Sequence, residues 1–397
     1  MSWPMVKLGD VCKLINGDRG KNYPSKDALF SEGIPFINAG NLQNDLSIKC
    51  SGANFISEER FDLLSNGKVQ MGDILFCLRG SLGKFAIVDE SILRGAIASS
   101  LVIIRPKNQL DHDFLKNYLR SSSCGKEIER FENGAAQPNL SAKDLKEFEI
   151  PLPPLAEQQR IAAILDKADA IRRKRQQAIQ LADNFLRAVF LDMFGDPVTN
   201  PKGWSLKKLE KLASKIGSGA TPKGGKEAYL NEGISLIRSL NIHDDNFLHK
   251  NLAFLSDDQA KALSNVDVKS GDVLLNITGA SVCRTAIVDE TILPARVNQH
   301  VCIIRSDILM PEFLLHVLIS KAYKRQLLNI ANAGGATREA LTKVQVGNLN
   351  IPVPPIELQE KFSVIKRKVK KIIENENELL NEPLFDSLSQ KAFTGKL

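Results

Sequence analysis

The residue types that most often carry out catalysis occur in this sequence, but their spacing builds no known catalytic centre. The segment GATPKGGKE, from Gly219, comes nearest to a phosphate-binding loop, yet it has one residue too many and Glu227 where a magnesium-binding Ser or Thr is needed. The overlapping GSGATP, from Gly217, places Pro222 at the third glycine of a dinucleotide-binding turn. No GxSxG, HExxH or amino-methyltransferase tetrapeptide is found. We therefore expect a chain that binds rather than catalyses.

Metal and redox motifs are missing as well. No CxxC pair occurs, and no histidine stands at metal-ligand spacing from a cysteine, so we expect buried, reduced thiols and no metal site. The six cysteines are Cys12, Cys50, Cys77, Cys124, Cys283 and Cys302. The first residues, MSWPMVKLGD, lack the apolar core of a signal peptide, and eighteen apolar residues never run together. The sequence predicts a cytoplasmic protein that has no membrane partner.

The composition is typical of an ordinary folded protein with more than one domain. The chain has 397 residues, of which 43% are hydrophobic and 25% are charged. Its 53 Lys and Arg exceed its 46 Asp and Glu, which gives a net charge of +7. This balance is compatible with a polyanionic partner but does not require one.

The chain contains one sequence plan twice. IPLPPLAEQQ, from Ile150, matches IPVPPIELQE, from Ile351, at a shift of about 200 residues. The same shift pairs further segments in the same order: WPMVKL with WSLKKL, GIPFI with GISLI, GDILF with GDVLL, and AIVDE with a second AIVDE. Phe385 and Gly395 near the C-terminus match Phe185 and Gly195, which precede the second copy. A tandem duplication explains these matches, and it predicts a cyclic arrangement in which the C-terminus lies near the start of the first copy.

Each copy begins with a globular region and ends in a long helix. Short apolar runs such as DILFCL, FAIVD and LVIIRP, separated by Gly, Asn, Asp and Pro, predict strands and turns. The segment HDFLKNYLRSS predicts a helix after Asp111. We place the globular regions at 1–150 and 204–350, the first long helix at 151–194, a linker at 195–203, and the second long helix with the C-terminal segment at 351–397.

The two long helices each carry a narrow apolar stripe with alternating three- and four-residue steps, which is a heptad pattern. We expect the stripes to pack against each other as an antiparallel pair, about 50 and 40 Å long at ~1.5 Å per residue. The basic run Arg172–Arg175 is interpreted as a solvated or partner-facing surface rather than a DNA clamp. The predicted seam residues are Ile161, Ile164, Ala168, Ile171, Phe185, Leu358, Phe362, Ile365, Val369 and Ile372.

Several of these segments together resemble the specificity subunit of type I restriction and modification enzymes. They are GDILFCLRGSLGKFAIV, GAAQPNLSAKDLKEFEIPLPPLAEQQRIAAILDKAD, FGDPVTNPKGW, NQHVCIIR and IPVPPIELQE. The resemblance covers essentially the whole chain, including the duplication. It implies an α+β fold in which two globular α/β target-recognition domains are joined by two long helices forming an antiparallel coiled coil, with a pseudo-two-fold internal repeat.

The same resemblance implies a division of labour. Each globular region would read one half of an asymmetric, divided double-stranded DNA target, and the helices would set the gap and dock two modification subunits. The chain itself would be non-catalytic and would need no cofactor, since S-adenosylmethionine, ATP and magnesium are expected on the modification subunits and on the restriction subunits that can join them. With domain centres about 40 to 50 Å apart, the half-site centres would be about 12 to 15 base pairs apart.

The candidate DNA-contacting residues lie in polar loops at corresponding places of the two copies. Arg and Lys suit phosphates and guanine edges, whereas Asn and Gln can bond adenine bidentately; for each residue a role in holding its own loop is the alternative. In the first copy they are Arg19, Lys21, Asn22, Arg79, Ser81, Lys84, Gln137 and Asn139. In the second copy they are Lys223, Lys226, Arg238, Asn241, Thr278, Arg284, Asn298, Gln299, His300 and Arg338.

Three other functions remain open at this point. A nuclease or methyltransferase fused to recognition modules would require a catalytic motif. A duplicated scaffold that joins proteins without reading DNA would lack salt-dependent DNA binding. A solitary donor of recognition domains would be distinguished by its genomic neighbours.

Overall fold

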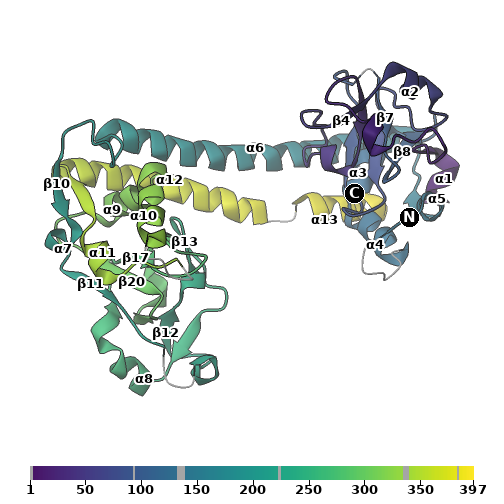
Figure 1. The fold of residues 1–397 in the computed structure, drawn as a ribbon. Helices are drawn as coiled ribbons and strands as arrows, with labels where there is room; N and C mark the ends of the chain where they lie inside the picture. The colour runs from purple at the N-terminus through teal and green to yellow at the C-terminus, as the bar shows by residue number, and fades with distance from the viewer. Residues whose placement is uncertain (1–2, 93, 132–138, 222–224, 334–338, 382–383) are drawn as a thin grey trace. The chain divides into compact units, whose positions relative to one another are not determined.

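The computed structural model describes residues 3–92, 94–131, 139–221, 225–333, 339–381 and 384–397. Backbone contacts divide the chain into two compact units (Figure 1). Unit 1 consists of Met1–Gln176 and Leu380–Leu397, and unit 2 consists of Gln177–Leu379. Each unit therefore contains one globular region of the repeat and parts of the long helices.

Unit 1 has short strands and helices, as expected from its short apolar runs. Its strands are β1 (Met5–Lys7), β2 (Cys12–Asn16), β3 (Ile34–Ile37), β4 (Asn54–Ile56), β5 (Ile74–Cys77), β6 (Phe85–Ile87), β7 (Ala96–Ile97), β8 (Leu101–Pro106) and β9 (Glu149–Pro151). Its helices are α1 (Leu8–Val11), η1 (Lys26–Ala28), η2 (Ala39–Asn41), α2 (Glu58–Leu63), α3 (His112–Arg120), α4 (Ser122–Phe131), α5 (Ala142–Lys146), the start of α6 (Leu155–Phe194) and α13 (Leu384–Phe393).

Unit 2 repeats this order with a few additional short elements. Its strands are β10 (Ser205–Lys208), β11 (Lys215–Ser218), β12 (Ile234–Ile237), β13 (Ile242–His243), β14 (Asn246–Phe247), β15 (Ala253–Leu255), β16 (Asp267–Val268), β17 (Val273–Asn276), β18 (Thr285–Ile287), β19 (Ala295–Val297), β20 (Val301–Arg305) and β21 (Asn350–Val353). Its helices are the end of α6, α7 (Leu209–Leu212), η3 (Gly225–Ala228), η4 (Ser239–Asn241), α8 (Asp257–Ala262), η5 (Ser264–Val266), η6 (Glu290–Ile292), α9 (Pro311–Ile319), α10 (Lys321–Asn332), α11 (Lys343–Gly347) and α12 (Ile356–Asn381).

The same antiparallel four-stranded sheet forms the centre of both units. Its order is β2-β8-β5-β6 in unit 1 and β11-β20-β17-β18 in unit 2. Side chains of β5 alternate between two cores: Ile74 and Phe76 enter one apolar cluster, and Leu75 and Cys77 enter another. Because both faces are covered, this strand is apolar throughout, which explains its continuous apolar run in the sequence.

The C-terminal segment completes unit 1, which confirms the predicted position of the C-terminus near the start of the chain. The indole Nε1 of Trp3 donates a hydrogen bond to the carbonyl of Ala392 at 2.9 Å, and Phe393 packs edge-on against Phe114 with ring centroids 5.4 Å apart. In unit 2, Trp204 makes the corresponding bond to the carbonyl of Phe194, also at 2.9 Å. Helix α13 thus takes in unit 1 the place that the end of α6 takes in unit 2.

The first turns of the two long helices belong to the cores of the globular regions. Gln158 and Gln359 are buried and bond the backbone N–H groups of Asp111 and Met310, at 2.8 and 2.9 Å. Such bonds satisfy the buried amides and fix the first turns of α6 to unit 1 and those of α12 to unit 2.

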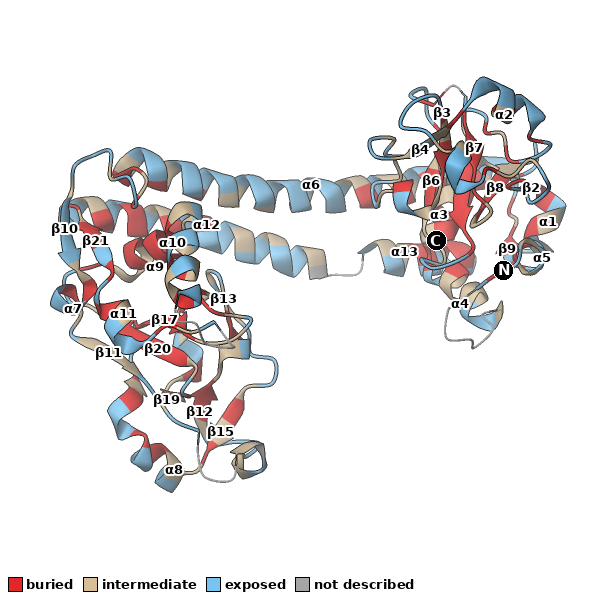
Figure 2. Cartoon of the chain, viewed as in Figure 1, coloured by how far each residue is buried: buried red, intermediate tan, exposed pale blue. Residues whose placement is uncertain are grey.

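The predicted seam is therefore buried only in part. Ile161, Ala168, Phe362 and Val369 are buried, and Ile161 and Phe362 lie in the apolar clusters of the globular regions. Ile164, Leu358 and Ile365 are half-buried, whereas Ile171, Phe185 and Ile372 are exposed. The middle of α6 is accordingly pale blue in Figure 2.

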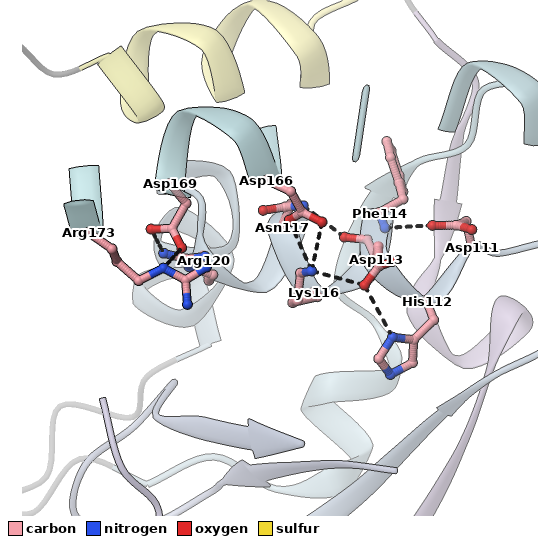
Figure 3. Close-up of polar contacts among 10 residues, drawn as sticks. All are labelled: Asp111, His112, Asp113, Phe114, Lys116, Asn117, Arg120, Asp166, Asp169 and Arg173. Atoms are coloured by element: carbon pink, nitrogen blue, oxygen red, sulfur yellow. Dashed lines mark hydrogen bonds and ion pairs between the residues drawn. The ribbon is translucent and has the colours of Figure 1, made fainter. Parts of the chain in front are cut away.

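Charged side chains connect α6 to α3 in unit 1 (Figure 3). Lys116 bonds Asp166 of α6 and Asp113 of its own helix, each at 2.9 Å. Asp169 is almost fully buried and receives bonds from Arg120, Arg172 and Arg173. Arg172 and Arg173 of the basic run are thus held by one buried carboxylate.

The equivalent junction of unit 2 has the opposite distribution of charge. Arg367 of α12 lies 3.1 Å from Glu312 of α9, and Lys366 lies 2.8 Å from Asp245 in the β13–β14 turn. Lys366 occupies the position that Leu165 occupies in unit 1, and both side chains are buried. The long helix supplies the acids in unit 1 and the bases in unit 2.

Candidate nucleic-acid interface

Three loops meet at one end of the central sheet in each unit. In unit 1, Asn16 pairs with Val102 and Cys77 pairs with Leu101. The loops that follow β2 and β5 therefore lie beside the turn that precedes β8, because β8 runs antiparallel to both strands. In unit 2, Ser218 pairs with Cys302 and Asn276 with Val301, which brings the equivalent loops together.

Backbone hydrogen bonds join these loops to a fourth segment. Leu78 N–H donates to Ser100 O at 2.9 Å, and Leu140 N–H donates to Leu78 O at 3.0 Å. The corresponding bonds in unit 2 run from Ile277 to His300 and from Leu341 to Ile277, at 2.9 and 2.8 Å. The loops are thus fixed in the same relative positions in both units, although their side chains differ.

Basic and amide side chains gather on this loop surface in unit 1. Arg79 is exposed and its backbone forms a bridge with Asn139, which is also exposed. Arg19 is exposed as well, and its guanidinium donates to Ser99 O at 3.3 Å. The structure therefore brings Arg19, Arg79 and Asn139 onto one surface.

Asp18 holds the loop that carries Arg19. Its Oδ1 accepts from Gly20 N–H at 2.7 Å, and its Oδ2 accepts from both the backbone and the hydroxyl of Ser65 at 2.9 Å. These hydrogen bonds lower the pKa of the Asp18 carboxyl, the bond from Gly20 most strongly. A charged Asp18 thus fixes the backbone on either side of Arg19.

The remaining predicted residues of unit 1 differ in their exposure to solvent. Lys21 and Ser81 are exposed, and Lys84 is half-buried. Asn22 is half-buried and uses its amide to donate to Leu63 O at 2.8 Å, which supports a loop-holding role. Gln137 lies outside the described residues.

In unit 2, a chain of hydrogen-bonded side chains crosses the loop surface. Thr221 donates its hydroxyl to Gln299 Oε1, and Gln299 Nε2 lies 3.1 Å from His300 Nε2. His300 Nδ1 in turn contacts the Thr278 hydroxyl. The three predicted residues Thr278, Gln299 and His300 are thus in direct contact with one another or with a shared neighbour.

Two predicted DNA contacts of unit 2 have buried side chains. Asn241 is fully buried, and its amide bonds the backbone of Arg238, Leu248 and Lys250. Asn298 is buried and accepts from His300 N–H at 3.0 Å. Their burial supports the alternative role of holding the loop, because an Asn that shapes a loop has the same sequence signature as one that reads a base.

The other predicted residues of unit 2 take no part in this group of hydrogen-bonded side chains. Arg238 directs its guanidinium to the carbonyl of Asn251 and stands over the ring of Tyr229, 5.2 Å from its centroid. Arg284 is half-buried on the loop after β17. Lys223, Arg338 and the side chain of Lys226 lie outside the described residues.

Sequence reasoning missed Thr221, Ser99 and Ser100. Ser99 and Ser100 stand where the second copy has Gln299 and His300, so aligning the two copies through VIIR and CIIR would have marked them. Thr221 offers no comparable signal, because a Thr in a Gly-rich loop is common and only the fold brings it to Gln299.

The interface offers hydrogen bonds and positive charge rather than reactive groups. Burial raises the pKa of the Cys77 thiol next to Arg79, and it raises the pKa of Cys283 to about 12 and of Cys302 to about 11. These thiols are protonated at neutral pH and are poor nucleophiles. Within the described part of the chain, no group of three or more His, Cys, Asp or Glu side chains is placed to hold a metal ion.

Comparison with protein families gives two matches to one model. The model described as "Type I restriction modification DNA specificity domain" matches residues 2–181 and again residues 201–382. Among curated relatives, the type I restriction enzyme MjaVIII specificity subunit of Methanocaldococcus jannaschii is 24% identical over 392 residues, covering 94% of this chain and 87% of the relative. The EcoKI specificity subunit of Escherichia coli is 20% identical over 434 residues, covering 100% and 89%.

Solved structures show the same fold. The crystal structure of the type I restriction-modification system S subunit from M. genitalium aligns over 99% of this chain and 96% of its own, with a TM-score of 0.60 and 17% identity. A chain from a study of complex assembly and conformational transition of the type I system aligns over 100% and 98%, with a TM-score of 0.60 and 20% identity.

Proposed function

Because the chain belongs to the family of type I restriction modification DNA specificity domains and contains this domain twice, we propose that the loop surface at the end of each central sheet reads one part of a divided double-stranded DNA target. The chain is the specificity subunit of a type I restriction-modification complex. It supplies DNA recognition, and the methyltransferase and restriction subunits that it binds supply the chemistry.

The observation that carries this proposal is the repetition of one loop framework with different side chains. The backbone hydrogen bonds that join the loops are the same in the two units. The side chains at equivalent positions differ: Arg79 of unit 1 corresponds to Thr278 of unit 2, and Ser99 corresponds to Gln299. A constant framework with variable side chains is what two readers of two different sequences require. The proposed target is therefore asymmetric.

The long helices are proposed to set the gap between the two parts of the target and to dock the modification subunits. Helix α6 has 40 residues and contributes to both units, and α12 has 26. Their exposed apolar residues Ile171, Phe185 and Ile372 are available for partner helices. We also place the chain in the cytoplasm, where it would meet DNA; no helix of the described segments is both long and apolar enough to span a bilayer.

The proposal is tested by DNA binding of the full chain in complex with a modification subunit. Binding to a pool of duplexes should weaken steeply as salt rises, because phosphate contacts release counterions. Arg79→Ala should lower affinity and, if Arg79 binds a phosphate, reduce the salt slope by about 1. Lys13→Ala is the matched control, since Lys13 is exposed on β2 in register with Arg105, away from the loops. Salt-independent or absent binding would favour a protein scaffold instead.

A further inference from the structure

The hydrogen-bonded side chains on the loop surface of unit 2 fix the side-chain amide of Gln299 in place. Gln299 is exposed, yet both polar atoms of its side chain are already engaged, Oε1 by the hydroxyl of Thr221 and Nε2 by the ring of His300. His300 is itself held by Thr278. An exposed glutamine normally samples many rotamers, so anchoring at both ends reduces the entropy that it would lose on binding a ligand.

The anchored amide still has one donor and one acceptor to offer. A glutamine side chain has two N–H donors and two carbonyl lone pairs, and the contacts with Thr221 and His300 use one position on each atom. Exchanging the amide O and N does not change this result, since the threonine hydroxyl and the imidazole can each donate or accept. In either orientation, Gln299 therefore keeps one donor position and one acceptor position for a ligand.

A donor next to an acceptor complements only one base edge in the major groove. Adenine presents the N7 acceptor beside the N6 donor, whereas guanine presents two acceptors, cytosine presents one donor, and thymine presents one acceptor beside a methyl group. Resting on the proposed function, we infer that Gln299 reads an adenine in the part of the target bound by unit 2, and that His300, Thr221 and Thr278 position its amide.

Unit 1 does not repeat this arrangement. Ser99 is at the position equivalent to Gln299, and its backbone carbonyl accepts a hydrogen bond from Arg19. Arg79 is at the position equivalent to Thr278. Guanidinium groups are donors only, so this surface complements the two acceptors of guanine or the oxygens of phosphate. Among the described residues of these loops, the anchoring of a Gln amide by two side chains is therefore particular to unit 2.

The inference is tested by selecting bound duplexes from a randomised pool with the full complex. The wild-type complex should select a divided motif with an adenine in one part. Gln299→Ala should lose the preference at that single position, by about 5- to 150-fold, and leave the other part of the motif unchanged. Gln299→Glu should shift the preference from adenine toward cytosine, because a carboxylate accepts from the cytosine amino group. Ser99→Ala, at the equivalent position of unit 1, is the control and should keep the adenine.

The outcomes separate this inference from the function on which it rests. A wild-type motif that stays the same in both Gln299 variants would overturn the adenine assignment and leave DNA recognition intact. A wild-type complex that selects no motif would overturn both. Because Gln299 is exposed, neither substitution disturbs the core, and retention of the other half of the motif would show that the variant is folded.

Discussion

Asp166 of α6 and Arg367 of α12 occupy equivalent positions in the two repeats and carry opposite charges, and each pairs with the neighbouring helix of its own unit. Asp166 lies 2.9 Å from Lys116, and Arg367 lies 3.1 Å from Glu312. If α6 packed on the globular region of unit 2, Asp166 would meet Glu312, an acid like itself. The reversed pairs therefore favour the native combination of helix and domain in a chain whose two halves are otherwise similar.

Replacing Asp169 by Asn should destabilise unit 1 at neutral pH and much less in acid. Burial would raise the pKa of the Asp169 carboxyl, but bonds from Arg120 and Arg172 and the charges of Arg120 and Arg173 lower it to about 2 from 3.8. The lowered pKa means that the carboxylate stabilises the fold above about pH 4 and that this contribution is lost as pH falls toward 2. We expect a loss of about 1–3 kcal/mol at pH 7.

Urea unfolding followed by Trp3 fluorescence checks this prediction. The sequence has 2 tryptophans, one in each unit, so a Trp204→Phe background leaves Trp3 as the reporter of unit 1. Asp192→Asn, at an exposed position of α6, is the control. If Asp169→Asn lowered the free energy of unfolding equally at pH 7 and pH 3, the carboxylate would act by its shape and not by its charge.

Replacing Lys366 by Leu should leave the stability of unit 2 within about 1 kcal/mol of the wild type, or raise it. Burial lowers the pKa of Lys366, and its pairing with Asp245 offsets the cost of desolvation only in part. Leu is the residue that unit 1 has at this position. Asp245→Asn should instead cost about 3 kcal/mol, since it leaves a buried ammonium without a counter-ion.

The reporter for these two variants is Trp204 in a Trp3→Phe background, with urea as denaturant. Asn at position 245 tolerates the positive φ of 56° found there, so a loss of stability reports the charge and not the backbone. If Lys366→Leu were as destabilising as Asp245→Asn, the ion pair would be a net stabilising interaction, contrary to the prediction.

Gly219→Ala should weaken DNA binding by unit 2 more than Gly217→Ala does. A Cβ at position 219 would lie 1.7 Å from the carbonyl oxygen of Val297, whereas a Cβ at 217 would meet no heavy atom within 4 Å. The loop carrying Thr221 would have to move away from Gln299, and the anchored amide would be lost. Selection from a randomised pool should show a weaker preference in one half of the motif only. Equal behaviour of the two variants would contradict this account of the loop.

Lengthening both long helices by seven residues should lengthen the gap in the target. Seven helical residues add ~10.5 Å, which corresponds to about three base pairs at ~34 Å per turn of DNA. Insertions after Gln176 in α6 and after Glu374 in α12 fall at exposed positions. The gap is read from the motif that the complex selects or methylates. An unchanged gap would show that the helices do not act as the spacer.

Much of this fold could be predicted from the sequence because the duplication is visible in it. The matched segments predicted two similar globular regions, and the match of Phe385 and Gly395 to Phe185 and Gly195 predicted the return of the C-terminus to the first copy. The bond from Trp3 to Ala392 confirms that return. Patterns that occur twice in the same order constrain a fold more strongly than a single apolar run does.

The details of the interface and of the long helices could not be predicted in the same way. Whether an Asn in a polar loop is exposed depends on which backbone groups surround it, so Asn241 and Asn298 were assigned to DNA although they are buried. A heptad pattern does not specify what covers it, and Ile161 and Phe362 prove to be covered by the cores of the globular regions. The charge reversal between Asp166 and Arg367 is present in the sequence, but its meaning depends on Lys116 and Glu312 lying opposite them.

The most direct test of the central claim is single-molecule sequencing of genomic DNA from cells that express this chain with its modification subunit, scored for N6-methyladenine. The account predicts one asymmetric motif, divided into two parts by a gap of fixed length, with an adenine in the part read by unit 2. Absence of methylation while the modification subunit is bound to the chain would contradict it, because a specificity subunit that assembles but does not direct methylation does not read DNA.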